Sequence, residues 1–248
     1  MPYTHLSNLY DTFIEVDYPG WSTFVHQVID IYSSYSQHKL LELGCGTGSL
    51  TAQLAQRYPV LAVDISPDML RIAKEKVTQP HVTFLTQDMS QLHLTPKQQQ
   101  GLTVCVSACD CLNYLTEPEA LMATFERVHE VLAPGGLFIF DLNTPYKYEH
   151  VLADNSYHYT DDTGAVIWEN LFDPESQLNE YYLTLFKQDL STGMYERLQE
   201  SHYQLAYSAE FIKQSLAFAG FELVTTCDDY THQAPTDTTQ RMVFVAKK

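Results

Sequence analysis

The sequence predicts an α/β fold in which a doubly wound, mostly parallel β-sheet carries a small antiparallel β insert. Through the first two-thirds of the chain, short runs that are apolar on both faces alternate with amphipathic stretches. This alternation is typical of buried parallel strands with helices on both sides of the sheet. After residue 155 strand-like runs follow one another with only turn sequences between them, which indicates antiparallel strands. The 248 residues are enough for one large domain or two small ones.

The parallel part of the sheet is expected to contain five strands with helices between them. The strands are predicted at residues 39–43, 60–63, 82–85, 102–107 and 137–140, and the helices at residues 49–57, 66–77 and 118–132. The second helix has the clearest start, because Ser66 is a good N-cap, Pro67 suits the first helical position and Asp68 faces the positive helix end. Ligands of such sheets bind beyond the carboxyl ends of the strands. The residues that stand at these ends are Gly44, Asp64, Asp88, Asp110 and Asp141.

The last third of the chain is predicted to insert an antiparallel unit before the sheet is completed. Its strands are expected at residues 166–170, 181–186 and 197–207, with turns at 173–176 and 191–193. A helix at 208–219 and strands at 222–226 and 242–246 then return to the main sheet. We therefore divide the chain into an N-terminal helical cap (1–37), a ligand-binding α/β domain (38–156 and 208–248) and an antiparallel insert (157–207) that serves as a lid, a substrate contact or a dimer contact.

The composition excludes several classes of function. Acidic residues outnumber basic ones by 31 to 14, and the net charge of −17 disfavours a nucleic-acid partner. The sequence contains no apolar run long enough to span a membrane and no secretory signal at its start, so we expect a cytoplasmic protein. Five cysteines are an odd number, three of them clustered, which favours free thiols in a reducing compartment.

The most specific motif is the segment Glu42-Leu43-Gly44-Cys45-Gly46-Thr47-Gly48, which connects a predicted strand to a predicted helix. Glycines allow a tight turn and let a ligand lie against bare backbone N–H groups. A dinucleotide-binding loop has the spacing Gly-x-Gly-x-x-Gly, whereas the spacing here is Gly-x-Gly-x-Gly. The shorter spacing resembles motif I of the class I S-adenosylmethionine-dependent methyltransferases, in which the loop lies against the methionyl part of the cofactor.

Three further segments support this resemblance. Asp64 ends the second strand, where an acid can accept hydrogen bonds from both ribose hydroxyls; Asp88-Met89 follows the third strand, where the family recognises adenine; and residues 134–137 read Pro-Gly-Gly-Leu. The resemblance implies a Rossmann-like, seven-stranded sheet whose last strand is antiparallel, with S-adenosyl-L-methionine as cofactor. The cofactor-binding residues that it implies are Tyr10, Glu42, Gly44, Cys45, Gly46, Gly48, Asp64, Ile65, Met69, Asp88, Met89, Ala108 and Cys109.

The segments at 110–115 and 141–147 resemble a group of largely uncharacterised bacterial methyltransferases. More distantly, the chain is similar to glycine N-methyltransferase and to sugar-amine N-methyltransferases. These also have an N-terminal helix with a Tyr-Asp pair, like Tyr10-Asp11 here, and an antiparallel insert that forms a lid and often a dimer contact. The resemblance implies that Tyr10 touches the cofactor carboxylate; a buried anchor for the N-terminal helix is an equally good interpretation.

No catalytic triad or metal site is required for methyl transfer, since the methyl donor carries its own electrophile. The candidates for shaping the catalytic site are Asn113, Tyr114, Asn143 and Tyr10. A general base is needed only if the acceptor arrives protonated. His150, His158 and His202 lie in or next to the insert, but each is expected to be a polar surface residue. Cys105, Cys109 and Cys111 are expected to bind no metal, since a structural zinc site needs four ligands.

These observations predict an enzyme that methylates a nitrogen or oxygen of a small molecule. An acidic surrounding favours an amine as the acceptor, and an exposed edge of the insert is compatible with a homodimer. The Asp/Asn-Pro-Pro-aromatic motif of nucleic-acid amino methyltransferases is missing after the fourth strand. Three alternatives stay open: a methyltransferase that acts on tRNA or protein, a nicotinamide-dependent oxidoreductase, and a non-catalytic cofactor-binding module.

Overall fold

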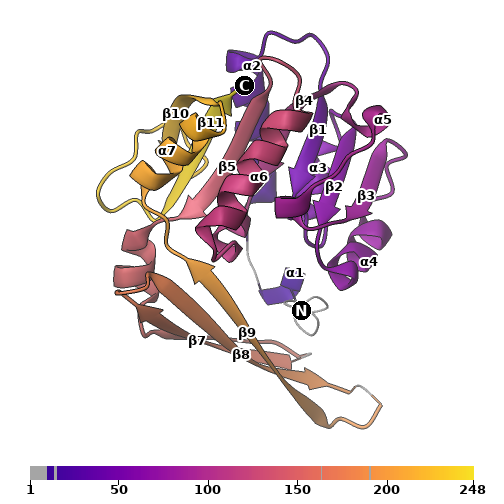
Figure 1. The fold of residues 1–248 in the computed structure, drawn as a ribbon. Coiled ribbons are helices and arrows are strands. Elements are labelled where there is room, and N and C mark those ends of the chain that lie inside the picture. The colour runs from indigo at the N-terminus through magenta and orange to yellow at the C-terminus, as the bar shows by residue number, and fades with distance from the viewer. Residues whose placement is uncertain (1–9, 14–15, 163, 190) are drawn as a thin grey trace.

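The computed structural model describes residues 10–13, 16–162, 164–189 and 191–248 and contains two β-sheets (Figure 1). The larger sheet has seven strands in the order β10-β11-β5-β4-β1-β2-β3, and the smaller has four in the order β6-β7-β8-β9. The strands β1 to β5 are parallel to one another, and β11 is antiparallel to both β5 and β10. The predicted fold class is thus confirmed, including the antiparallel last strand and the separate antiparallel insert.

The strands of the large sheet lie where the apolar runs predict them. They are β1 (Lys39–Leu43), β2 (Val60–Asp64), β3 (Val82–Thr86), β4 (Leu102–Ser107), β5 (Leu137–Asn143), β10 (Glu222–Asp228) and β11 (Arg241–Lys247). The strand order reverses between β1 and β4, because the chain moves outward to β2 and β3 on one side of β1 and returns to β4 on the other. A ligand site is expected at the carboxyl ends of these two strands.

Helices cover both faces of this sheet. The longer ones are α2 (Tyr18–Tyr32), α4 (Pro67–Lys76), α6 (Pro118–Val131) and α7 (Ala209–Phe218), and the shorter ones are α1 (Tyr10–Phe13), α3 (Ser49–Leu54), α5 (Pro96–Gln99), η2 (Met89–Gln91), η3 (Cys111–Tyr114) and η4 (Lys147–Leu152). The helix predicted at 49–57 ends at Leu54. Beyond it the N–H groups of Gln56 and Arg57 donate to carbonyls three residues back, so the last turn tightens.

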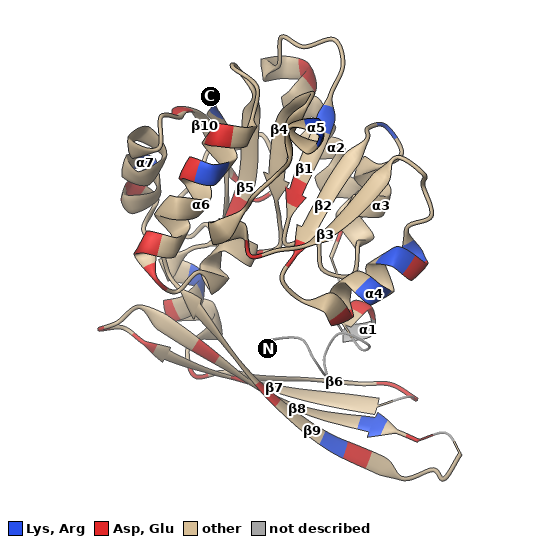
Figure 2. Cartoon of the chain, turned by 45° about the vertical axis from the view of Figure 1, so that its right-hand side comes forward, with Lys and Arg blue, Asp and Glu red and all other residues tan. Residues whose placement is uncertain are grey.

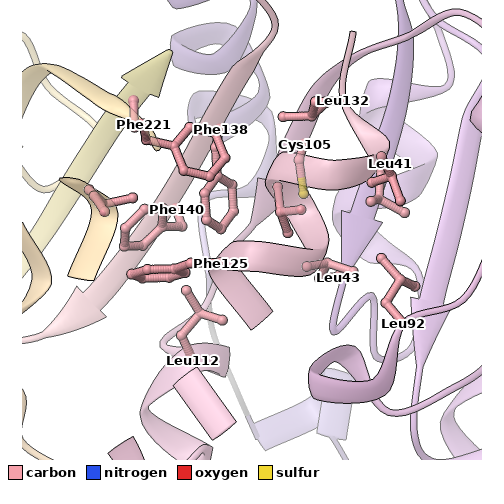
Figure 3. Close-up of a cluster of buried hydrophobic side chains, with 14 of the residues drawn as sticks. Leu41, Leu43, Leu92, Cys105, Leu112, Phe125, Leu132, Phe138, Phe140 and Phe221 are labelled. Atoms are coloured by element: carbon pink, nitrogen blue, oxygen red, sulfur yellow. The ribbon is translucent and has the colours of Figure 1, made fainter. Parts of the chain in front are cut away.

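Alternate residues of the strands build two separate apolar layers. On one face Phe138 and Phe140 pack against Phe125 of α6, in a cluster that also contains Leu41 (Figure 3). On the other face Leu40 packs with Trp21 and other apolar residues of α2 and α3. Successive residues of a strand point to opposite faces, so each buried strand contributes to both layers. The helix α2 lies within the segment predicted as an N-terminal helical cap (1–37); residues 1–9 and 14–15 of that segment lie outside the described residues.

The insert sheet consists of β6 (Ser156–Thr160), β7 (Gly164–Asp173), β8 (Leu178–Gln188) and β9 (Tyr195–Leu205). Figures 1 and 2 show it beneath the carboxyl ends of the large sheet, with α1 between the two. The strand β6 and the helix η4 were not expected from the sequence. In the described part of the chain, no helix has the length and apolar character needed to cross a membrane.

Candidate active site

The glycine loop after β1 adopts backbone conformations that side chains disfavour. Gly44 and Gly46 have φ angles of +67° and +52°. A Cβ atom at Gly44 would lie 1.9 Å from the sulfur of Cys111, whereas one at Gly46 would meet nothing within 4 Å. Gly44 is therefore required by packing, and Gly46 leaves the backbone open toward the cavity described below. Gly48 (φ +79°) packs against Ala73 of α4 and does not line that cavity.

Asp64, at the end of β2, holds this loop in place. Its Oδ2 accepts a hydrogen bond from the Gly46 N–H at 2.8 Å, and its Oδ1 accepts one from the Ser66 N–H at 2.8 Å. The side chain is buried, and burial raises the pKa of Asp64 against the opposing effect of the N–H donors. Carboxylate oxygens have more than one lone pair each, so Asp64 can accept further hydrogen bonds from a ligand.

A cavity of about 310 Å³ lies over the carboxyl ends of β1, β2 and β4. The predicted cofactor-binding residues that line it are Tyr10, Gly44, Gly46, Asp64, Ile65, Met69, Asp88, Met89, Ala108 and Cys109. Gln87, Cys111, Tyr114 and Leu115 also line it and were not assigned to the cofactor from the sequence. Asp88 additionally caps η2, because its Oδ1 accepts a hydrogen bond from the Ser90 N–H at 2.8 Å.

A smaller adjoining cavity of about 40 Å³ is lined by Glu42 and Cys45 together with Tyr18 and residues of the glycine loop. Glu42 is 2% exposed, and its Oε2 has no hydrogen-bond partner among the described residues. Burial, reinforced by the nearby Asp64, raises the pKa of Glu42 to about 8. The residues lining the two cavities include three acids and, in the described chain, no Lys, Arg or His. The larger cavity therefore favours positive charge, and a cation beside Glu42 would favour the ionised form of that side chain.

The short helix α1 is fastened to the glycine loop by hydrogen bonds. Asp11 accepts bonds from the hydroxyls of Thr47 (2.7 Å) and Ser49 (3.1 Å), and Lys76 Nζ lies 2.6 Å from its other oxygen. These contacts hold Tyr10 against the cavity, where its hydroxyl lies 3.6 Å from Cys109 Sγ. Tyr10 also packs on the apolar cluster of the insert around Leu183. Both interpretations of Tyr10, ligand contact and anchor, are compatible with this position.

The loop after β4 is shaped by a buried ionic network that sequence reasoning did not identify. Arg241 at the start of β11 donates to Asp141 (2.7 Å) and to Asp110 (2.8 Å). Asp141 also accepts the N–H groups of Cys109 and Asp110, two residues with left-handed φ angles of 62° and 48°. Left-handed backbone costs energy in non-glycine residues, and these hydrogen bonds stabilise it. Arg241 follows Cys109 by more than a hundred residues, so no local signal could connect the two.

Of the three remaining catalytic candidates, one lines the larger cavity and two do not. Tyr114 lines the larger cavity. Asn113 and Asn143 do not: the Asn113 amide bonds the backbone of Asn143 (3.0 Å) and Leu205 (2.8 Å), and Lys147 donates to the Asn143 side chain (2.9 Å). The hydrogen bonds of Asn113 connect η3 to β5 and to the insert strand β9.

The prediction that all three histidines near the insert lie on the surface is wrong for His202. His150 and His158 are exposed, whereas His202 is 2% exposed, because it lies on the inner face of the insert. All five cysteines are free, and Cys105 is buried within β4. In the parts of the chain that the structure describes, no group of three or more His, Cys, Asp or Glu could hold a metal ion.

The parallel sheet with its order reversal, the glycine loop and the acid after β2 together define a methyltransferase domain. The family model described as "Methyltransferase domain" matches residues 40–136. The crystal structure of an S-adenosylmethionine-dependent methyltransferase from Clostridium acetobutylicum is similar to this chain, with 30% identity, coverage of 99% of this chain and 98% of that one, and a TM-score of 0.86. The chain belongs to the family of S-adenosylmethionine-dependent methyltransferases, and the predicted cofactor is confirmed.

Two further proteins define the range of similarity. A protein from Geobacillus sp. (strain WCH70), named "Putative methyltransferase", is 36% identical over 257 residues that cover 100% of both chains. The structure of an S-adenosylmethionine-bound amino pentose methyltransferase from Micromonospora echinaspora is 17% identical, covers 100% of this chain and 98% of that one, and has a TM-score of 0.73. This second similarity shows a shared fold. Membership of the family sets the nicotinamide-dependent alternative aside.

Proposed function

We propose that the chain transfers a methyl group from S-adenosylmethionine to a nitrogen or oxygen of a small molecule, with amines as the favoured acceptors. The observation that carries this proposal is the acidic lining of the cavities at the glycine loop. Glu42, Asp64 and Asp88 face these cavities without a basic neighbour among the lining residues. A cationic sulfonium and a cationic amine are both attracted to such a site.

The residues present fit the cofactor. The open backbone at Gly46 offers a surface for the methionyl part, and the unpartnered oxygen of Glu42 is suited to an ammonium group. Asp64 would accept the ribose hydroxyls, and Asp88 with Met89 would bind adenine. When bound, the cofactor supplies an electrophilic methyl group. The chain's own residues position it, exclude water and orient the acceptor.

A small acceptor agrees with the position of the insert. The insert sheet lies beneath the cavity-forming strand ends (Figure 1), and α1 is fastened over the glycine loop by Asp11. We infer that these elements restrict the approach of a folded macromolecule to the cavity. An amino pentose methyltransferase shares the fold, so the fold accommodates a small amine-bearing acceptor. Methylation of tRNA is disfavoured by the net charge of −17.

The test begins with calorimetric titration of the protein with S-adenosylhomocysteine, with NADH as the parallel control. Binding of the first compound alone is expected. A screen with S-adenosylmethionine then compares primary amines, amino sugars, alcohols and carboxylates, with product mass as the readout. We expect a mass increase of one methyl group in amines or alcohols. Transfer restricted to carboxylates, to tRNA or to protein would contradict the proposal. A cytoplasmic location, the domain division and a homodimer remain predictions.

A further inference from the structure

Three polar side chains form a continuous chain from the insert to the cavity. The Tyr114 hydroxyl lies 3.5 Å from His202 Nδ1, and His202 Nε2 lies 3.2 Å from a carboxylate oxygen of Glu200. The side chains of His202 and Glu200 are 1% and 6% exposed. Tyr114 is the member of the chain that lines the cavity. A carboxylate and an imidazole are thus buried behind a tyrosine that faces the ligand site.

The fold brings these residues together from two separate parts of the sequence. Glu200 and His202 are two positions apart on β9, so both point to the inner face of the insert. Tyr114 ends the helix η3 that follows β4. Gln204, the next residue on the inner face of β9, donates to Asp110 at 2.8 Å. That bond, together with the one from Asn113 to Leu205, fixes β9 against η3.

The order of the groups determines which proton each can exchange. A carboxylate at Nε2 favours the imidazole tautomer that carries its proton on Nε2. Nδ1 is then unprotonated and lies 3.5 Å from the Tyr114 hydroxyl, which can donate to it. His202 is faced by Glu200 on its own strand, by Tyr181 opposite it on β8, and by Tyr114 from η3. A carboxylate, an imidazole and a hydroxyl that follow one another in this spatial order form the arrangement that activates nucleophiles in other enzymes.

We propose that Tyr114, His202 and Glu200 form a proton relay that accepts the proton of the methyl acceptor; this rests on the proposed function. An ammonium acceptor passes one proton to the Tyr114 oxygen before its nitrogen attacks, and a hydroxyl acceptor passes its proton as its oxygen attacks. The acceptor atom then forms a bond to the methyl carbon as the sulfur–carbon bond breaks. The Tyr114 proton moves to His202 Nδ1, and Glu200 stabilises the resulting imidazolium. Tyr114 is the catalytic residue of this relay, and His202 and Glu200 are positioning residues that act through it.

The relay explains why the insert contributes to chemistry as well as to enclosure. An amine that enters an acidic cavity arrives as an ammonium ion, and a hydroxyl arrives protonated. Neither has a free lone pair of sufficient reactivity until its proton is removed. The 3.5 Å separation between Tyr114 and His202 is long for a hydrogen bond, and such contacts often shorten only when the substrate is bound.

The first measurement is independent of the acceptor. Nitrogen-15 spectra of the histidine side chains, recorded with S-adenosylhomocysteine present, identify the tautomer of His202. We expect the proton on Nε2, a shift of the Nδ1 resonance in Tyr114→Phe, and a larger fraction of the other tautomer in Glu200→Gln. A proton on Nδ1 in the wild-type protein would overturn the relay, because that nitrogen could not accept from Tyr114.

The second measurement uses the amine or alcohol that the screen identifies. His202→Gln and Tyr114→Phe are expected to lower kcat about 10²–10⁴-fold with unchanged S-adenosylhomocysteine affinity. The pH profile of kcat should differ between the wild type and His202→Gln. Tyr203→Phe is the matched control, because Tyr203 lies on the outer face of β9 with its hydroxyl on Glu180.

The outcomes separate the two proposals. Transfer that survives His202→Gln with the same pH profile overturns the relay and leaves the proposed function intact. Failure of the wild-type protein to methylate any amine or alcohol overturns the proposed function and, with it, the relay. Loss of activity together with loss of S-adenosylhomocysteine binding in His202→Gln, while Glu200→Gln and Tyr114→Phe stay active, would assign His202 a structural role and also overturn the relay.

Discussion

Two carboxylates at neighbouring strand ends differ in their environments. Both oxygens of Asp64 accept backbone N–H groups, so its charge is partly compensated before any ligand binds. Glu42 is buried with one oxygen unpartnered, and its pKa is raised to about 8. At neutral pH, Glu42 therefore holds a proton in much of the population of protein molecules without bound cofactor. A cationic group beside it would favour release of that proton.

This difference predicts the pH dependence of stability for Glu42→Gln, which imitates the protonated side chain. The folded-state pKa of about 8 lies above the ordinary value of 4.5. Between these values the folded protein holds a proton that the unfolded chain has lost, so wild-type stability falls as the pH rises. We expect the variant to match the wild type near pH 5 and to exceed it increasingly up to pH 8, by at most about 1.4 kcal/mol for each pH unit.

Urea unfolding of both proteins at pH 5, 6.5 and 8 checks this expectation. The difference between the two proteins removes the contribution of the other titrating groups. A stability difference that does not change over this range would show that Glu42 is already ionised in the folded protein. In calorimetry, wild-type binding of S-adenosylhomocysteine near pH 7 should release protons, and binding by the variant should release fewer.

Asp64→Ala is expected to weaken S-adenosylhomocysteine binding by about 1–3 kcal/mol, roughly 5- to 150-fold. The substitution removes a ribose acceptor and also frees the N–H groups of Gly46 and Ser66. Calorimetry measures the affinity. Asp68→Ala is the control, since Asp68 stands in the first turn of α4 and does not line the cavity. Equal affinities for Asp64→Ala and the wild type would refute the assignment of Asp64.

Residues of a local motif could be predicted from the sequence, whereas residues supplied by distant segments could not. The glycine loop, Asp64 and Asp88 each stand at the end of a predictable strand, and they line the cavities. Arg241 reaches Asp141 across the β5–β11 pairing, and nothing near Arg241 in the sequence marks it. The same holds for His202, whose burial depends on how the insert docks. Its strand alone has too few apolar residues to indicate which face is covered.

At the scale of elements, the helix α1 is too short to be stable alone. It is held by Asp11, which contacts Thr47, Ser49 and Lys76. Because Thr47 belongs to the glycine loop, Ser49 begins α3 and Lys76 ends α4, the position of α1 is connected to the structure of the cofactor site. A ligand that orders the loop would also order α1.

Because Asp11 links α1 to the cofactor site, we expect Asp11→Ala to lower S-adenosylhomocysteine affinity about 2- to 10-fold with little change in melting temperature. The Asp11–Lys76 pair is 40% and 30% exposed, so the ion pair itself contributes only about 0.2–1 kcal/mol. A double-mutant cycle with Lys76→Ala separates this pair from the hydroxyl contacts. If Asp11→Ala binds as tightly as the wild type, α1 is not coupled to the cofactor site.

The inner strands β1, β2, β4 and β5 of the large sheet were predictable because they are buried on both faces and read as continuous apolar runs. The strand predicted at 102–107 coincides with β4. The strand β6 reads Ser-Tyr-His-Tyr-Thr and is mostly exposed, so it carries no apolar run and forms through its pairing with β7. The helix η4 forms where Tyr148 and Leu152 become buried against the insert, which is a tertiary effect that local sequence does not report.

At the scale of the whole molecule, charge and architecture act on the same ligand. The net charge is −17, and Figure 2 shows acidic residues on both the large sheet's domain and the insert. Glu42, Asp64 and Asp88 line the cavities at the strand ends, on the side of the sheet where the insert lies. Such a field raises the local concentration of cations and their rate of association.

The electrostatic field of the acidic protein should make kcat/KM for a cationic amine acceptor depend on salt. We expect kcat/KM to fall several-fold when the salt concentration rises from about 10 mM to about 300 mM, because the Debye length shrinks from about 30 Å to less than 8 Å. The kcat value should change little, since the buried carboxylates at the reacting groups are screened far less. Initial rates at saturating S-adenosylmethionine provide both constants. A neutral alcohol acceptor, where one is active, should show almost no salt dependence. A parallel fall of kcat, or an equal effect on the neutral acceptor, would mean that salt acts on the fold of the site and that long-range attraction plays no part in acceptor capture.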